Sequence, residues 1–130
     1  MKTKFTLSFF FLGIFSLSVM ANDSDKTESY PPTSMPDDVK AVIQNKCFGC
    51  HNTDSKNDKA KEDLDFKAFA DLSKMKQISS YKKINEVLGE NEMPPKKFLD
   101  HYPDKKLTED EKKVLMKWAK AEAEKLVKGM

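Results

Sequence analysis

Apolar residues recur every three or four positions along much of the chain, which is the spacing of one face of an α-helix. In the first such stretch, a proline and two acids at residues 36–38 mark the start of a helix, and the apolar positions continue to Cys47. In the second, the pattern runs over residues 78–88, and Gly89 follows as a helix stop. No stretch alternates between apolar and polar residues as a half-buried strand would. The pattern therefore predicts an all-α fold.

The last apolar stretch has the clearest helix signal. It opens with a capping box at Thr108–Glu111, in which the threonine and the glutamate satisfy the first free backbone N–H groups. Its apolar stripe consists of Val114, Leu115, Trp118, Ala121 and Leu126. A shorter helix is expected over residues 64–72. The charged residues 52–63 predict an exposed loop, and the proline-containing residues 94–104 predict irregular chain.

The first 21 residues have the composition of a secretory signal peptide. Two lysines form its positive start, residues 5–20 form an apolar run, and Ala21 ends a Val-Met-Ala cleavage pattern. The run of about 16 apolar residues is shorter than the ~20 that span a bilayer, so we expect cleavage after Ala21 and no stable membrane anchor. Residues 22–35 are polar and contain two prolines, which predicts a flexible linker. Residues 36–128 then form the folded domain.

The charge of the chain limits the class of partner. All 23 basic residues are lysines, against 21 acids, and the leader's two lysines account for the formal excess. A nucleic-acid-binding domain would favour a basic excess, usually with arginine, so we expect no nucleic-acid partner. The mature domain is small and poor in apolar residues, and a bound cofactor would therefore help to stabilise it. We expect it to work as a monomer.

The pentapeptide Cys47-Phe48-Gly49-Cys50-His51 carries the candidate chemistry. Its C-x-x-C-H spacing is the attachment signature of a c-type haem. Two thiols one helical turn apart can add to the two vinyl groups of one porphyrin, and the next histidine can give an imidazole nitrogen to the iron. The motif thus predicts one haem c per chain, with Cys47 and Cys50 as thioether links and His51 as the proximal ligand. Such attachment takes place outside the cytoplasm, so together with the leader it predicts a periplasmic protein.

Two other kinds of site could use the same residues. A redox-active dithiol also has a C-x-x-C spacing, but it normally lies at a strand-to-helix junction, and it leaves His51 unexplained. A Cys₂His₂ zinc site could recruit both cysteines with His51 and His101. Zinc fingers, however, place their histidines well away from the cysteines in sequence. Both alternatives are weaker than haem.

Met93 is the best candidate for the second axial position of a haem iron. It lies in the segment Glu92-Met93-Pro94-Pro95, which its prolines stiffen. Because Pro94 biases the preceding residue toward extended backbone, the segment could hold a thioether against the far side of the ring. A methionine opposite a histidine raises the iron potential relative to two histidines. His101 is the competing ligand, and an open distal position is the third possibility.

The chain resembles the class I monohaem cytochromes c in the order of three features. These are a C-x-x-C-H motif after an amphipathic helix, the Glu-Met-Pro-Pro segment, and a last helix with Leu115 and Trp118. More narrowly, they are similar to the haem-binding-domain proteins among exported bacterial monohaem cytochromes. The resemblance covers residues 36–128. It implies a small helical domain wrapped around one covalently attached haem, in which the first and last helices cross. It also implies that Trp118 packs near the first helix or the haem.

The function that the resemblance implies is that of a one-electron carrier, which exchanges electrons with redox partner proteins and is not an enzyme. The alternative is a haem-based sensor of small ligands, or a weak peroxidase, with an open distal site. A peroxidase would need a distal acid–base residue such as His101 or Glu92.

Overall fold

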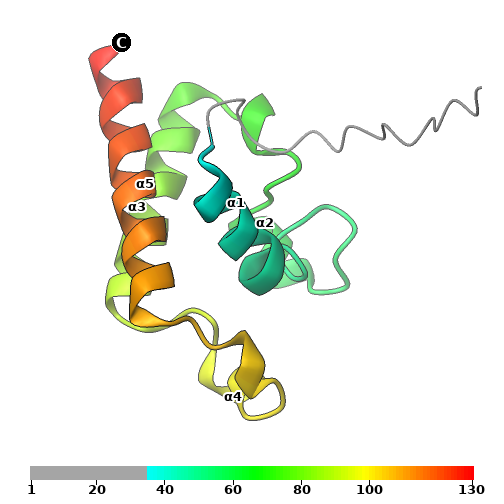
Figure 1. Cartoon of the computed structure of the whole chain (residues 1–130). Helices are drawn as coiled ribbons and strands as arrows, with labels where there is room; N and C mark the ends of the chain where they lie inside the picture. Colours follow the sequence, from blue (N-terminus) through cyan, green and yellow to red (C-terminus); the bar gives the residue numbers. More distant parts are fainter. Residues whose placement is uncertain (1–34) are drawn as a thin grey trace, which may run out of the picture.

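The computed structural model describes residues 35–130, which are mostly helical and contain no strand (Figure 1). The helical segments in chain order are α1 (Asp37–Val42), η1 (Ile43–Cys47), α2 (Asp58–Asp63), η2 (Phe69–Asp71), α3 (Lys74–Gly89), α4 (Lys96–Leu99), η3 (Pro103–Lys105) and α5 (Glu109–Lys128). The η1 segment is a π-helix, and η2 and η3 are 3₁₀-helices. The all-α prediction is confirmed for these residues. The predicted leader, and the linker up to residue 34, lie outside the described residues.

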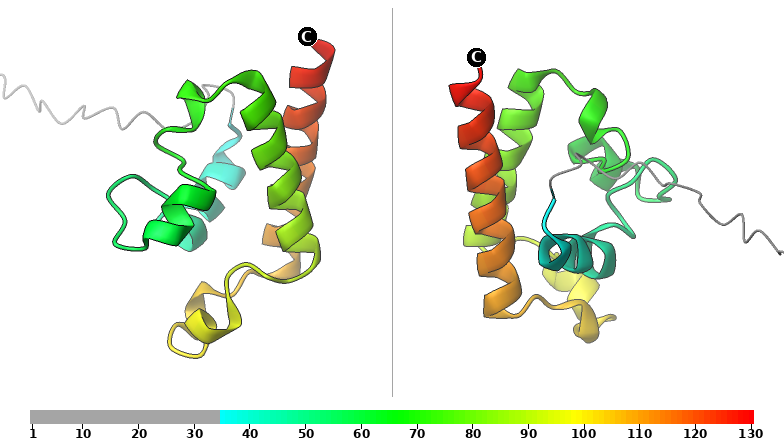
Figure 2. Two further views of the ribbon diagram at one scale, coloured as in Figure 1. Left: turned by 180° about the vertical axis from the view of Figure 1, so that it is seen from behind. Right: turned by 45° about the horizontal axis from the view of Figure 1, so that its top comes forward.

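The body of the domain is an antiparallel pair of helices, α3 and α5, which lie side by side in both views of Figure 2. The first helix, α1, packs against α5, in agreement with the contact that the resemblance implies. The buried apolar core consists of Val39, Ile43, Phe66, Phe69, Tyr81, Leu88, Leu115, Trp118, Ala119 and Ala123. At its centre the ring of Tyr81 lies 4.9 Å from that of Phe69 and 5.2 Å from that of Trp118. Each such pair adds about 0.5–1.5 kcal/mol beyond area burial, so these rings join α3 to α5 and η2.

The capping box at the start of α5 is confirmed. The Thr108 hydroxyl accepts from the Glu111 backbone N–H at 3.1 Å, and the Glu111 carboxylate accepts from the Thr108 N–H at 2.8 Å. Three acids in the first turn of α5 also suit the positive end of the helix dipole. One position of the predicted stripe is wrong, because Ala121 is exposed and Ala119 is buried in its place.

Helix α3 ends differently from the prediction. Gly89 is its last helical residue, and the left-handed conformation falls on Asn91, with a φ of 58°. The Glu92 N–H donates to the Val87 carbonyl at 2.9 Å, and the Asn91 N–H donates to that of Leu88 at 3.3 Å. This pair of bonds is a Schellman motif, for which asparagine is an accepted residue. Asn91 is therefore the residue that turns the chain toward Met93.

The first helix begins at Asp37, as predicted, but it does not remain an α-helix to the end. From Ile43 to Cys47 the chain forms a π turn, in which the Phe48 N–H donates to the Ile43 carbonyl at 2.8 Å. Single π turns within α-helices are rare, and those that occur are often found at functional sites. Here the π turn delivers the chain to Cys47.

Two further expectations between the motif and α3 are wrong. The predicted loop over residues 52–63 contains α2, which Asn57 caps by accepting from the Ala60 N–H at 3.1 Å. Asn52, the first residue of the predicted loop, is buried, with 8 % of its surface exposed. The predicted helix over residues 64–72 is reduced to the single turn η2.

The residues between the Schellman turn and α5 form a small lobe, defined here as residues 93–107. It holds α4 and η3 and projects from the body at the bottom of Figure 1. The two short helices pack on each other, and the rings of Phe98 and Tyr102 lie 4.9 Å apart. The lobe is thus more ordered than the irregular chain predicted over residues 94–104. Within the described residues, no helix has the length and apolar character that crossing a bilayer requires.

Candidate functional site

The C-x-x-C-H motif forms one helical turn directly after η1. The backbone N–H groups of Cys50 and His51 both donate to the Cys47 carbonyl, each at 3.1 Å. Cys47 and Cys50 are therefore held one turn apart, the arrangement that the spacing predicts. Both are half-buried, and no disulfide joins them.

Two adjoining cavities lie beside this turn. The larger has a volume of about 360 Å³ and the smaller a volume of about 210 Å³. The residues that line both are Cys47, His51, Lys59, Asp63, Leu88 and Met93. Because the two cavities share these walls, they form one crevice of the size of a typical cofactor site, which is roughly 300–1,000 Å³.

The lining of the crevice is mostly apolar. The apolar side chains of the larger cavity come from four parts of the chain: Ile43, Leu64, Phe66, Ile84, Val87, Leu115 and Trp118. Pro94, Pro95 and Phe98 of the lobe line the smaller cavity, together with Cys50. Apolar walls of this kind suit the flat hydrophobic body of a porphyrin, and Ser80 and Lys83 supply polar groups to the lining of the larger cavity.

The ring of His51 is oriented by the backbone of α2 and the residue after it. Its Nδ1 lies 2.8 Å from the Ala60 carbonyl oxygen and 3.1 Å from that of Leu64. Because carbonyl oxygens only accept, Nδ1 must carry the proton, and a neutral ring then keeps its lone pair on Nε2. No group within residues 35–130 hydrogen-bonds to Nε2. Histidines that bind metals are commonly fixed by such a bond from the other nitrogen.

The acceptors for His51 are a feature that the sequence reasoning missed. They exist only because α2 forms, and α2 has no apolar stripe that a periodicity argument could detect. The available signal was the cap: Asn57 followed by an acid at Asp58, in the pattern of a helix start.

Met93 lies at the crevice, and His101 does not. Met93 lines both cavities and packs partly buried against the core. His101 is exposed in the lobe and is absent from the lining of either cavity. Of the two candidate distal ligands, Met93 is therefore the one that the fold brings to the same crevice as His51.

Comparison with known families decides the kind of cofactor. Residues 54–121, more than half of the chain, match the family described as the haem-binding domain. The chain belongs to this family. The matched range covers α2, the crevice walls on α3 and α5, and Met93, and it begins just after His51. No curated protein and no solved structure matched.

The Cys47 thiol of this haem-binding domain does not have the lowered pKa of a reactive redox thiol. Burial, reinforced by the nearby Cys50 and Glu111, raises the pKa of Cys47 from 9.0 to about 12. Its thiol therefore stays protonated at neutral pH, whereas reactive thiols of redox enzymes have lowered pKa values. A thiol that keeps its proton still fits addition to a vinyl group, because the addition transfers both the sulfur and the hydrogen.

The zinc alternative also lacks support in the haem-binding domain. Among residues 35–130, no three side chains of histidine, cysteine, aspartate or glutamate gather as a metal site would require. His101, the fourth ligand of the hypothetical zinc site, is exposed and lies outside the crevice lining. The donor set at the crevice therefore fits haem better than zinc.

Proposed function

We propose that this haem-binding domain is an exported c-type cytochrome, which holds one haem through Cys47 and Cys50 and acts as a one-electron carrier rather than as an enzyme. The observation that carries the proposal is the orientation of His51. Two backbone carbonyls fix its Nδ1–H, and its Nε2 is left for the crevice that both cysteines and Met93 also line.

Each cysteine would be linked by addition of its S–H across one vinyl group of the porphyrin. The sulfur bonds to one vinyl carbon and the hydrogen goes to the other, so no group leaves and no oxidant is consumed. The two half-buried thiols, which are held one helical turn apart, support this chemistry.

The chain's own residues bind and orient rather than react. His51 and Met93 would hold the iron through a ring nitrogen and a thioether sulfur, and the apolar side chains that line the crevice would pack against the porphyrin. Bound haem would supply an iron that alternates between the ferrous and ferric states, with a potential raised by the methionine and by burial. Redox proteins are the partners that such a carrier needs.

The alternative of a sensor or peroxidase with an open distal site is less well supported. Of its two acid–base candidates, His101 lies outside the lining of the crevice, while Glu92 lies in the lining of the larger cavity beside Met93. An open-site sensor or peroxidase would need empty space beside the iron. Met93 lines both cavities and would instead offer its sulfur as a ligand there.

The decisive test of the carrier is the absorption spectrum of the ferric, haem-loaded protein. We expect a methionine–iron charge-transfer band that is lost in Met93→Ala and kept in Met75→Ala, a control methionine that is 63 % exposed. Fast binding of carbon monoxide by the unmutated ferrous protein would contradict the carrier and favour the open-site alternative.

Covalent attachment has a separate test. We expect Cys47→Ala and Cys50→Ala each to retain one thioether, which the pyridine haemochrome spectrum and the intact mass report. Two covalent links in either variant would contradict the assignment. Export is tested by expressing the full chain in a bacterium: a mature periplasmic form should begin at Asn22.

A further inference from the structure

Two lysines from distant parts of the chain each donate hydrogen bonds to residues that adjoin the other lysine in sequence. The Lys46 ammonium donates to the carbonyls of Asp104 and Lys106, at 2.6 and 3.3 Å. The Lys105 ammonium donates to the backbone carbonyl and the side-chain oxygen of Asn45, at 3.1 and 3.0 Å. These bonds join segments about sixty residues apart in the sequence, and we call Lys46 and Lys105 the lysine clamp.

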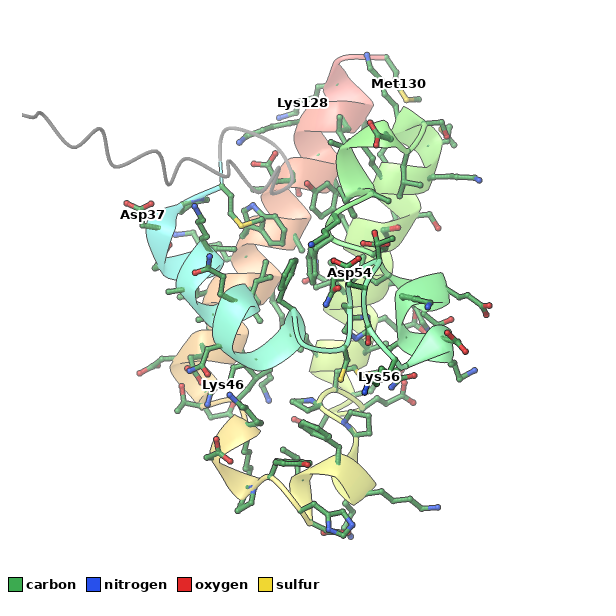
Figure 3. The ribbon with its side chains drawn as sticks, turned by 90° about the vertical axis from the view of Figure 1, so that its right-hand side faces the viewer. Asp37, Lys46, Asp54, Lys56, Lys128 and Met130 are labelled. Carbon is green, nitrogen blue, oxygen red and sulfur yellow. The ribbon has the colours of Figure 1, made fainter. Side chains whose placement is uncertain are left out.

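The clamp joins the haem-attachment motif to the lobe. Lys46 directly precedes Cys47 and lines the smaller cavity, and in Figure 3 it lies where the cyan ribbon comes close to the yellow lobe. Lys105 lies in η3, near the end of the lobe. At the lobe's other side, the Asn91 side chain accepts from the Lys112 ammonium at 2.9 Å. Met93 therefore lies between two anchored points.

Apart from Met93 and Leu107, which pack against the core, the lobe makes few other contacts with the helices of the body. Its helices α4 and η3 pack mainly on each other rather than on α1, α3 or α5. Its apolar contributions to the crevice are Met93, Pro94, Pro95, Phe98 and Leu107. A structure with so few contacts opens readily, so four hydrogen bonds at one end have a large effect on how often the crevice is closed.

We propose that Lys46 and Lys105 are positioning residues, which hold the lobe against the attachment motif and thereby keep Met93 at the crevice. The ligand role of Met93 belongs to the function proposed above, whereas the holding of the lobe does not depend on it. Three of the four acceptors are main-chain carbonyls. Holding the lobe therefore requires a cationic donor at residues 46 and 105, but no particular side chain at the residues that accept.

The first measurement is amide hydrogen exchange in the haem-loaded protein. The reporters are the Leu99 and Tyr102 amides, which donate to the Pro95 and Phe98 carbonyls at 3.1 and 3.0 Å. Lys46→Met and Lys105→Met should each accelerate their exchange about fivefold, since a hydrogen-bonding side chain of this kind contributes about 1 kcal/mol. Lys105→Arg should restore slow exchange.

The matched control is Lys97→Met. Lys97 lies on α4 of the same lobe, is exposed, and makes no hydrogen bond or ion pair among the described residues. The variant removes the same charge and should exchange at the unmutated rate. Equal exchange in Lys97→Met, Lys46→Met and Lys105→Met would overturn the proposal.

The second measurement is the rate at which imidazole binds the ferric protein in competition with Met93. Both clamp variants should bind imidazole about fivefold faster than the unmutated protein and Lys97→Met, because the lobe opens more often. Faster exchange with an unchanged imidazole rate would overturn the positioning of Met93. Absence of a methionine–iron band from the unmutated protein would contradict the His–Met site instead, and the exchange data would then decide whether the clamp holds the lobe.

Discussion

The Asn57→Ala substitution tests whether α2 sets the properties of His51. The Asn57 side chain accepts from the Ala60 N–H at 3.1 Å and is the N-cap of this six-residue helix. Loss of such a cap costs about 1 kcal/mol, which increases local opening of α2 about fivefold. Opening removes the carbonyls of Ala60 and Leu64 from His51 Nδ1.

The consequence for a bound iron is a higher reduction potential. A hydrogen bond from Nδ1–H to a carbonyl makes the imidazole a stronger donor, and a stronger donor favours the ferric state. If that bond favours ferric over ferrous iron by about 1 kcal/mol, its complete loss raises the potential by about 40 mV, at 59 mV per tenfold change for one electron. Partial opening gives a smaller rise in the same direction.

Two measurements on the haem-loaded protein check this prediction: the midpoint potential, and exchange of the Leu64 amide, which donates to Ala60 at 3.0 Å. Asn57→Ser is the matched control, because serine caps helices about as well as asparagine and adds no charge to a position that lines the smaller cavity. The reasoning is refuted if Asn57→Ala and Asn57→Ser show the same potential and exchange rate, or if the potential of Asn57→Ala falls.

Three other predictions concern the stability of the domain. Thr108→Ala should lower the free energy of unfolding by about 1 kcal/mol in urea titration, and Thr108→Ser should preserve it, because serine also caps. Phe69→Ala should cost about 3–5 kcal/mol, because Phe69 is 1 % exposed, whereas Val127→Ala, at an exposed position, should change stability by less than about 0.5 kcal/mol. In the protein without haem, the raised pKa of Cys47, about 12, means that the unfolded chain loses this proton first. The contribution of Cys47 to the free energy of unfolding should therefore be constant well below pH 9 and fall above it, by up to about 1.4 kcal/mol per pH unit. Cys47→Ala should abolish this fall between pH 9 and 10, and at higher pH the raised pKa of Tyr81 acts in the same direction.

The elements that were predicted correctly are those that depend on residues close together in the sequence. The capping box at Thr108 and the helix start at Asp37 depend on residues within one turn of each other, so their signals are visible in the chain itself. Met93 was singled out for its proline-rich context and lies in the crevice lining, while its role as an iron ligand stays a prediction.

The elements that the sequence did not reveal depend on hydrogen bonds that leave no apolar pattern. Helix α2 has no buried residue, and its cap and its bonds to His51 are what mark it. The π turn shifts each backbone bond by one residue and leaves the apolar spacing of Val39 and Ile43 unchanged. Asn91, and not Gly89, takes the left-handed position, because α3 continues for one residue beyond its last buried side chain, Leu88.

The acceptors that fix His51 are main-chain carbonyls, and this has a consequence for how the domain can vary. Every amino acid carries the same carbonyl, so substitutions at Ala60 or Leu64 that preserve α2 leave both acceptors in place. Substitutions in the segment that supports His51 are thus expected to leave the orientation of its ring unchanged. A site built in this way can change most of its surrounding side chains and keep its geometry.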